Sequence, residues 1–324
     1  MRLSVMVFGL VCVCALVIGL AAPGVQDEDD VRGAFLTSRP KVKPASSGNT
    51  ARPSRRRPKT SSSASNPGTS NVGSTKPGAT KSTSNRPDKT ADKSSGKPET
   101  AGNTVTPSTP AAPVNARRMG LGVTLFMRDS NGSAVRVDPN HVFRKGDRVR
   151  VLLETNSDGY LYIFNTTDNG SATMIYPHAD LDEGGNYVQA HVPFEIPSSL
   201  STDERLRWFA FDEVAGTERL FFVFAREPLG GVPIEDDLIA LCRESKDRCP
   251  VRPASDVWAV VQKEMQEPLK TDKTQQFGSI QTATEQQATT RGLGLSKDDP
   301  SPSLVMMASS PRSTLVATLD LIHK

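Results

Sequence analysis

The stretch with the most chemical potential is HADLDEGGN, which runs from His178 to Asn186. Asp180, Asp182 and Glu183 supply closely spaced carboxylates, the oxygen ligands that Ca²⁺ prefers. The segment lacks the glycine placement and the distant bidentate glutamate of an EF-hand loop. Three interpretations follow: a calcium site on these carboxylates, a hydrolytic site that adds His178, or a solvated hairpin loop, which is what short patterns of this kind most often are.

The established catalytic signatures are absent from the sequence. No His-Glu-x-x-His pair, no Gly-x-Ser-x-Gly elbow and no phosphate-binding P-loop occurs. The one Ser-x-x-Lys match, Ser94 to Lys97, lies in a low-complexity segment without the fixed geometry that would lower the pKa of a lysine. We therefore predict no catalytic residue and no cofactor, and we expect a protein that is not an enzyme.

Two cysteines, Cys242 and Cys249, lie outside the apolar N-terminal run. Cysteines so close together in an exported protein usually form a disulfide. Closing this loop would restrict the unfolded chain by roughly 2 to 3 kcal/mol on the entropy model. No second pair of ligands lies nearby to complete a zinc site, and the spacing is wider than that of a redox Cys-x-x-Cys motif.

Aromatic residues concentrate in the stretch GYLYIF, where Tyr160, Tyr162 and Phe164 share one face and Leu161 and Ile163 share the other. A strand that is apolar on both faces is typical of the centre of a covered sheet. In the alternative interpretation, Tyr160, Tyr162 and Trp208 line a groove for a sugar, a peptide or the strand of a partner. The core interpretation is favoured because soluble proteins rarely expose such a large apolar patch.

From Gly120 onwards, short alternating runs are separated by turns. The run RVRVLLE, for example, places Val149, Val151 and Leu153 inward and Arg148, Arg150 and Glu154 outward, toward solvent. Six further runs of this kind follow or precede it: GLGVTLFM, GYLYIFN, ATMIY, YVQAHV, LRWFAF and ERLFFVFA. Residues 117–324 are therefore predicted to form a mainly β domain, an antiparallel β-sandwich of the immunoglobulin-like or jelly-roll-like kind.

The pattern changes to a helical period within residues 232–268. We predict two short inserted α-helices, one carrying Ile234, Leu238 and Cys242, and one capped by Ser255 or Asp256. Residues 269–289 are expected to be flexible. The segments TRGLGLS and STLVATLDLIHK are predicted to be the last two strands, with KDDPSPSLVMMASSP as a loose loop between them.

The N-terminal 116 residues are predicted to lie outside the sandwich. Residues 1–21 have the basic start, the apolar run and the small residues of a signal peptide, and an uncleaved membrane anchor is the alternative. Residues 22–116 are expected to form a disordered linker rich in Ser, Thr, Pro and Lys. Residues 38–113 hold 14 basic against three acidic side chains, densest in RPSRRRPK, so an anionic envelope polymer is a possible partner, ahead of specific nucleic acid.

The ordered series of motifs resembles the bacterial family known as domain of unknown function 4384. The resemblance rests on FRKGDR, GYLYIFN, MIYP, VPFEIP and GTERLFFVFAREPL, over about residues 120–229, and on the closing LDLIHK. It implies an exported or envelope-facing accessory domain, and it transfers no catalytic residue. The resemblance also implies that such domains are often joined to peptidase, kinase or other signalling modules, and we expect none of these within the 324 residues.

The sequence therefore predicts a non-catalytic binding or accessory module that is secreted, periplasmic or otherwise associated with the cell envelope. A protein or peptide partner is expected to bind at a sheet edge. The alternatives are an envelope hydrolase built on His178, Asp180, Asp182 and Glu183, and a purely structural stalk-and-cap protein. If the N-terminal segment is not cleaved, the protein is anchored to the membrane.

Overall fold

A computed structural model of the chain describes residues 30–41, 55–56, 118–245, 249 and 251–324. All of these residues belong to one folded unit. The predicted signal peptide, residues 1–21, lies outside the described residues, as does most of the predicted linker. No helix within the described ranges is both long enough and apolar enough to cross a membrane.

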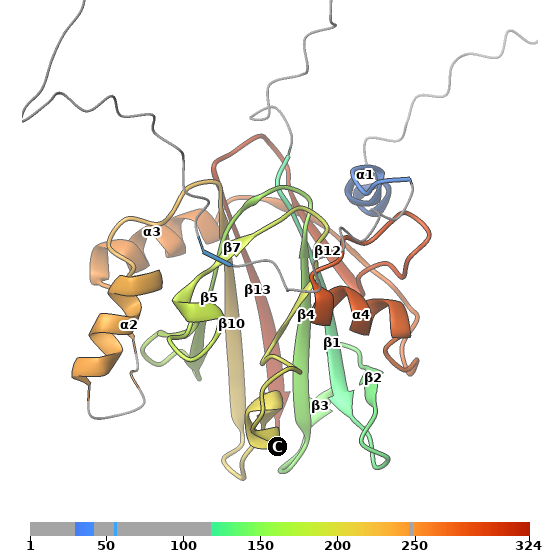
Figure 1. Cartoon of the computed structure of the whole chain (residues 1–324), viewed down its shortest axis with the longest axis horizontal. Coiled ribbons are helices and arrows are strands. Elements are labelled where there is room, and N and C mark those ends of the chain that lie inside the picture. The colour runs from blue at the N-terminus through green and yellow to red at the C-terminus, as the bar shows by residue number, and fades with distance from the viewer. Residues whose placement is uncertain (1–29, 42–54, 57–117, 246–248, 250) are drawn as a thin grey trace, which may run out of the picture. The chain divides into compact units, whose positions relative to one another are not determined.

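The fold is built from two sheets that face each other (Figure 1). The first is a seven-stranded sheet with the strand order β11-β12-β1-β4-β8, in which β2 also pairs with β1 and β9 also pairs with β4. Its strands are β1 (Gly120–Arg128), β2 (Ala134–Arg136), β4 (Arg148–Thr155), β8 (Phe194–Ile196), β9 (Phe209–Ala210), β11 (Leu269–Lys273) and β12 (Leu304–Ala308).

The second is a six-stranded sheet with the order β3-β13-β10-β5-β6, in which β7 also pairs with β5. Its strands are β3 (Val142–Phe143), β5 (Gly159–Thr167), β6 (Thr173–Tyr176), β7 (Tyr187–Val188), β10 (Gly216–Ala225) and β13 (Thr314–His323). The short pair β3–β13 is parallel, and the other pairs between these named strands are antiparallel. The predicted mainly β sandwich is confirmed.

The space between the sheets is filled by the alternating apolar residues that the sequence pattern identified. Val149, Val151 and Leu153 point into this core, where they meet residues of the opposite sheet such as Leu161 and Phe222. Each of these side chains has an exposed fraction of 1% or less. Their burial is the main stabilising contribution of the sandwich, because apolar side chains removed from water each stabilise by about 1.5 to 3 kcal/mol.

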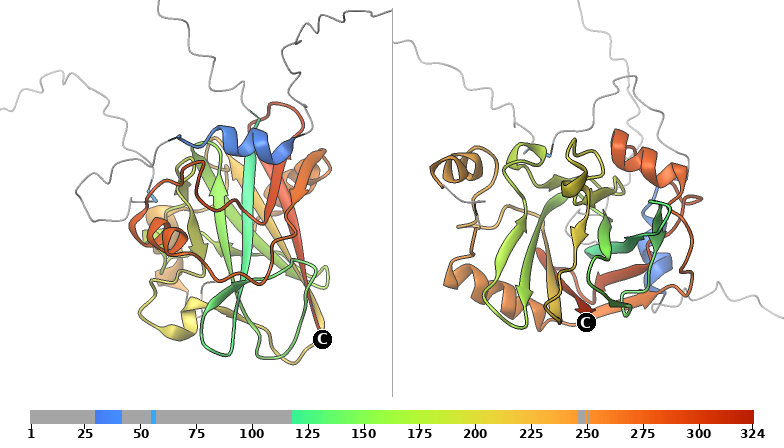
Figure 2. Two further views of the ribbon diagram at one scale, coloured as in Figure 1. Left: turned by 90° about the vertical axis from the view of Figure 1, so that its right-hand side faces the viewer. Right: turned by 90° about the horizontal axis from the view of Figure 1, so that it is seen from below.

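Helices cover the outer faces of both sheets (Figure 2). The α-helices are α1 (Val31–Thr37), α2 (Glu235–Glu244), α3 (Ser255–Met265) and α4 (Ala283–Arg291), and two 3-10 turns are η2 (Asp182–Gly184) and η3 (Glu204–Arg207). Helices α2 and α3 lie over the six-stranded sheet, where Leu238 and Val261 pack against Tyr162 and Phe164. Strand β5 is therefore two-faced, as predicted, but its aromatic face contacts the helices and not the opposite sheet.

The structure differs from the sequence predictions in the C-terminal third of the chain. Residues 269–289, expected to be flexible, contain β11 and the greater part of α4. Strand β12 lies within the segment that was expected to be a loose loop, whereas TRGLGLS forms the end of α4 and irregular structure. The predicted helices of the insertion are present as α2 and α3, although α3 begins after Ala254 without a side-chain cap.

Residues 30–41 also differ from the prediction, because they form a helix where a disordered linker was expected. Asp30 caps α1 by accepting a hydrogen bond from the Gly33 backbone nitrogen. Phe35 is fully buried in a cluster with Val305 and Met307 of β12. Helix α1 is thus part of the covering layer of the seven-stranded sheet.

Candidate functional site

Two neighbouring cavities lie beside the edge strands β6 and β9, and together we call them the edge groove. The cavity beside Glu218 and His323, which we call the polar cavity, has a volume of about 300 Å³. The cavity beside Met174 and Trp208, which we call the apolar cavity, has a volume of about 360 Å³. Ile175 of β6 and Phe209 of β9 line both cavities, so the two side chains mark the border between them. The groove therefore brings together residues from both sheets.

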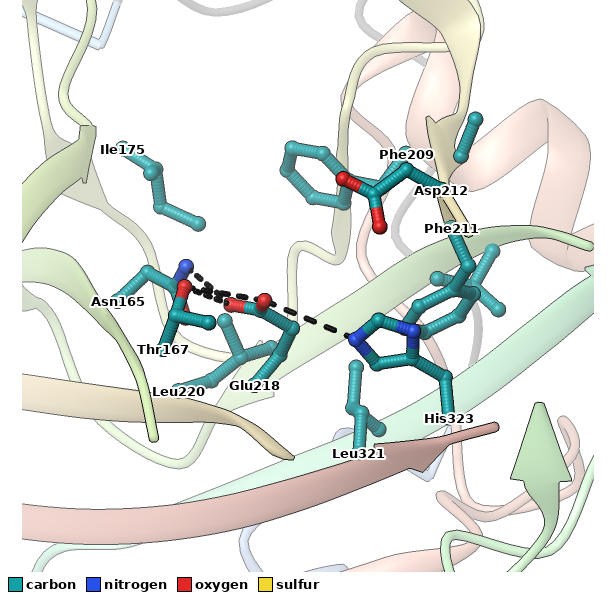
Figure 3. Close-up of a pocket in the computed structure, with 12 residues that line it drawn as sticks. Asn165, Thr167, Ile175, Phe209, Phe211, Asp212, Glu218, Leu220, Leu321 and His323 are labelled. Atoms are coloured by element: carbon teal, nitrogen blue, oxygen red, sulfur yellow. Dashed lines mark hydrogen bonds and ion pairs between the residues drawn. The ribbon is translucent and has the colours of Figure 1, made fainter. Parts of the chain in front are cut away.

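Glu218 is the central polar group of the polar cavity (Figure 3). Asn165 donates a hydrogen bond from Nδ2 to Glu218 Oε2 at 2.7 Å, and Thr167 Oγ1 lies 3.0 Å from both carboxylate oxygens. Adjacent strands position these residues, because β5 and β10 pair in register with Leu220 opposite Asn165. The carboxylate is thus held in one orientation by neutral donors, and no lysine or arginine of the described ranges forms an ion pair with it.

His323 faces Glu218 from the end of β13 (Figure 3). Its side chain is only 4% exposed, and neither ring nitrogen has a hydrogen-bond partner within the described part of the chain. The distance from Nε2 to Glu218 Oε1 is 3.9 Å, longer than a hydrogen bond. Burying an imidazole without partners is costly, and such exceptions in a folded protein often coincide with a functional group.

The polar cavity suits a ligand group that both donates hydrogen bonds and carries positive charge. Glu218 and Asp212 present carboxylates to it, and the rings of Phe209 and Phe211 form part of the wall (Figure 3). Carboxylates recognise ammonium and guanidinium groups through charge-assisted hydrogen bonds.

The apolar cavity is lined by side chains of a different kind. Met174, Ile196, Leu206 and Trp208 contribute mostly apolar surface. His178 also lines this cavity, and its Nδ1 accepts a hydrogen bond from the Asp180 backbone nitrogen at 3.2 Å. A side chain of ordinary hydrophobic size fits such a space, with the polar side chains of Thr173, His178 and Asp180 at its wall.

The three aromatic residues proposed as a binding surface are not brought together by the fold. Tyr160 and Tyr162 lie under α2 and α3, with 6% and 0% of their surfaces exposed, and the Tyr162 hydroxyl accepts a hydrogen bond from the Leu229 backbone nitrogen. Trp208 lies on the outer face of the seven-stranded sheet, stacked 4.0 Å beneath the Arg150 guanidinium. Of the three, Trp208 alone lines the edge groove.

The carboxylates proposed as a metal site do not converge either. Asp182 and Glu183 instead face basic side chains, Arg55 at 4.0 Å and Arg56 at 3.2 Å. Asp180 lines the apolar cavity beside His178, whose Nδ1 lies 3.8 Å from Asp180 Oδ2. No group of three or more His, Cys, Asp or Glu side chains in the described ranges has the arrangement of a metal site. The predicted pair Cys242–Cys249 is joined as a disulfide at the end of α2.

A hydrogen-bonded series of three residues was not foreseen from the sequence. Ser38 Oγ lies 2.8 Å from His191 Nε2, and His191 Nδ1 lies 2.7 Å from Glu154 Oε1. This is the order of groups in a serine hydrolase. Two features oppose that role: the Ser38 hydroxyl is also bonded to the Phe35 carbonyl, and Arg39 holds the same Glu154 carboxylate.

Burial of the Glu154 carboxyl acts to raise its pKa, but hydrogen bonds from His191 and Arg39 outweigh that cost and hold the pKa below its ordinary value. The carboxylate therefore stays charged inside the protein. Through its contacts with Arg39 and with His191, which lies next to Ser38, the Glu154 carboxylate holds residues 38 and 39 against β4. No local signal in the sequence links these residues, which lie far apart along the chain.

Comparison with known proteins adds one finding. Residues 142–228 match the family described as Domain of unknown function (DUF4384). The resemblance is confirmed for this segment. The DUF4384 match extends from β3 to just beyond β10, so it includes Asn165, Thr167 and Glu218 of the edge groove but not His323. Neither the search of curated proteins nor the search of solved structures found a match.

Proposed function

We propose that this protein is a non-catalytic binding module, exported or associated with the cell envelope, whose edge groove holds an extended segment of a partner protein. The observation that carries the proposal is the buried imidazole of His323, which has no hydrogen-bond partner among the described residues and lies 3.9 Å from the oriented carboxylate of Glu218. A ligand that supplies hydrogen bonds to both groups would remove the cost of burying them.

The chemistry of the two cavities favours a partner segment with a basic side chain next to an apolar one. The basic group would be accepted by Glu218 and Asp212, and the apolar group would enter the neighbouring cavity beside Trp208. The groove lies beside edge strands of both sheets. Edge strands commonly bind peptides by adding a further strand, which places alternate side chains on one face.

A library of fluorescent hexapeptides that pair Lys or Arg with Leu or Trp tests this function. Basic-apolar peptides should bind the full chain more tightly than matched peptides in which Glu replaces the basic residue. Glu218→Gln keeps an oxygen that Asn165 and Thr167 can bond but removes the charge, so we expect the affinity to fall at least tenfold. Lys145→Met, at an exposed ion pair outside the groove, serves as the control.

The binding-module proposal fails if no peptide binds, if acidic peptides bind equally well, or if Glu218→Gln leaves the affinity unchanged. The first of these outcomes would favour the stalk-and-cap alternative. Contact between the basic linker and an anionic envelope polymer is a separate part of the proposal. It predicts retention on envelope preparations that is reversed by salt and weakened when residues 58–114, which carry seven of the 14 basic side chains of residues 38–113, are deleted.

An envelope hydrolase is the second candidate function. Its original site loses support because only His178 and Asp180 line one cavity, whereas Asp182 and Glu183 face Arg55 and Arg56. The Ser38–His191–Glu154 series gives a specific reason to test it. Labelling of the wild-type protein by a fluorophosphonate probe, abolished by Ser38→Ala, would establish a reactive serine; absence of labelling would remove the candidate.

A further inference from the structure

A basic segment of the chain itself occupies a small acidic site where β7, at the edge of the six-stranded sheet, lies near β8 of the seven-stranded sheet and the start of α2. We call this surface the arginine seat; it consists of Asp182, Glu183, Gly185, Phe194 and Asp236. Arg55 and Arg56, the first two arginines of the RRR run, lie in it.

The seat positions the backbone of its occupant as well as the side chains. The Tyr187 nitrogen, at the start of edge strand β7, donates a 2.8 Å hydrogen bond to the Arg55 carbonyl. A Cβ atom on Gly185 would lie only 2.4 Å from that same carbonyl oxygen. Gly185 therefore leaves the space through which the Arg55–Arg56 backbone passes, and any side chain at this position would close it.

The two side chains of the occupant make different contacts. The Arg55 side chain is 3% exposed, its guanidinium stacks 4.4 Å above the Phe194 ring, and Nε lies 4.0 Å from Asp182 Oδ2. A desolvated stacking contact of this kind is selective for guanidinium groups. Arg56 is about a third exposed, with Glu183 at 3.2 Å and Asp236 also bound.

Those carboxylates are mostly open to water. Glu183 and Asp236 are 74% and 84% exposed in their ion pairs with Arg56. The hydrogen bond from Arg56 to Asp236 raises the pKa of the guanidinium, so Arg56 keeps its positive charge. Exposed ion pairs are weak because water and salt screen the charges, so the contacts of Arg56 are readily exchanged.

We propose that the arginine seat is a recognition site for an extended Arg-Arg segment of a partner protein, and that Arg55 and Arg56 occupy it in cis as a competing gate. The first arginine of the segment is selected by the backbone hydrogen bond, the space beside Gly185 and the Phe194 ring. The second arginine binds the exposed carboxylates of Glu183 and Asp236. Only 13 residues separate Arg55 from Lys41, at the end of the described α1 segment, so the internal segment has a high effective concentration at the seat.

The probe for this proposal is the fluorescent peptide RPSRRRPK, which copies residues 52–59, measured against the full chain by anisotropy. The double variant Arg55→Ala/Arg56→Ala vacates the seat and should bind the peptide at least tenfold more tightly than the wild-type protein does. A peptide with alanines in place of the first two arginines of its RRR run should not bind. If the double variant does not fold, peptide binding is measured on the single variant Arg56→Ala, which changes the more exposed of the two arginines and should also bind the peptide more tightly than the wild-type protein does.

Gly185→Ala provides the matched control, because its added methyl group would block the seat for both occupants. Placed in the double variant, it should abolish peptide binding. Placed alone in the wild-type chain, it should release the internal segment and accelerate tryptic cleavage after Arg55 and Arg56. Equal affinity of the peptide for wild type and double variant would refute the gate, and absence of binding to the vacated seat would refute the recognition site.

This inference is independent of the edge groove. Glu218→Gln, which should weaken binding of the basic-apolar hexapeptides, should leave RPSRRRPK binding to the double variant unchanged. Failure of one proposal is therefore distinguishable from failure of the other.

Discussion

Arg39 and Glu154 form a bidentate ion pair across 115 positions of sequence, with hydrogen bonds of 2.8 and 2.6 Å between guanidinium and carboxylate. The remaining three N–H groups of Arg39 donate to backbone carbonyls of Ser296, Asp299 and Pro300 at 2.9 to 3.1 Å. All five donors of this buried guanidinium are thereby used. One side chain thus joins the N-terminal segment, the centre of the seven-stranded sheet and the loop that precedes β12.

Removing one member of this pair should destabilise the protein strongly. Arg39→Met leaves the Glu154 carboxylate buried without its cation, and breaking a buried pair in this way costs about 3 to 5 kcal/mol. Urea unfolding of the variant measures the loss. Lys145→Met, which removes an ion pair whose side chains are 68% and 74% exposed, should change the stability by less than about 1 kcal/mol. Equal effects of the two substitutions would contradict the role given to Arg39.

The same pair predicts a loss of stability in acid. The pKa of Glu154 is lowered in the folded protein, from an ordinary value of 4.5. A carboxyl with a depressed folded pKa contributes its full stabilisation above the unfolded value, and this contribution is lost as pH falls below about 4.5 through the folded pKa. The Tm should therefore drop below pH 4.5, and Glu154→Gln should make that drop shallower. An unchanged acid profile in Glu154→Gln would refute the linkage.

His323 offers a test of whether the edge groove is kept for binding at the expense of stability. His323→Leu removes two buried ring nitrogens that have no hydrogen-bond partner in the described part of the chain, so the free energy of unfolding should stay unchanged or rise by about 1 kcal/mol. The same substitution should weaken binding of the basic-apolar hexapeptides. Thermal unfolding and anisotropy measure the two effects. A marked fall in Tm would mean that the imidazole is a structural group.

Gly159, at the start of β5, should not tolerate a side chain. A Cβ atom there would lie 2.5 Å from the Ala225 carbonyl oxygen of β10 and 2.7 Å from the Phe224 ring. Forcing the strands apart should cost about 1 to 3 kcal/mol in Gly159→Ala. Gly230 has nothing within 4 Å of the same position and no positive φ, so Gly230→Ala should be neutral or slightly stabilising. Denaturant midpoints of the two variants provide the comparison.

The sequence predicted those elements in which apolar residues repeat with the regular spacing of a strand or a helix. Alternation predicted β4 and the two-faced β5, and the helical spacing predicted α2 and α3. Alternation did not show what covers the outer face of β4. Arg150 and Glu154 were placed toward solvent, yet they are 7% and 3% exposed, because polar partners cover that face.

Segments with polar composition were the hardest to predict. Strand β11 and helix α4 lack an apolar stripe, because their contacts are polar: Glu285 of α4, for example, is held by a buried ion pair with Arg136. The edge groove was missed for a related reason. His323 and Glu218 meet only after β10 and β13 pair, and no spacing along the chain places them together.

The attachment of α1 alters how the linker is connected. Residues 30–41 are fastened to the seven-stranded sheet through Phe35 and Arg39, and the chain re-enters that sheet at Gly120. The intervening sequence is therefore tied to the same body at both ends. A single proteolytic cut between residues 42 and 117 would leave two pieces that remain associated as a nicked complex, and separating them would require the buried Arg39 to leave its site. For this protein, cleavage of the linker and release of its N-terminal part are two different events.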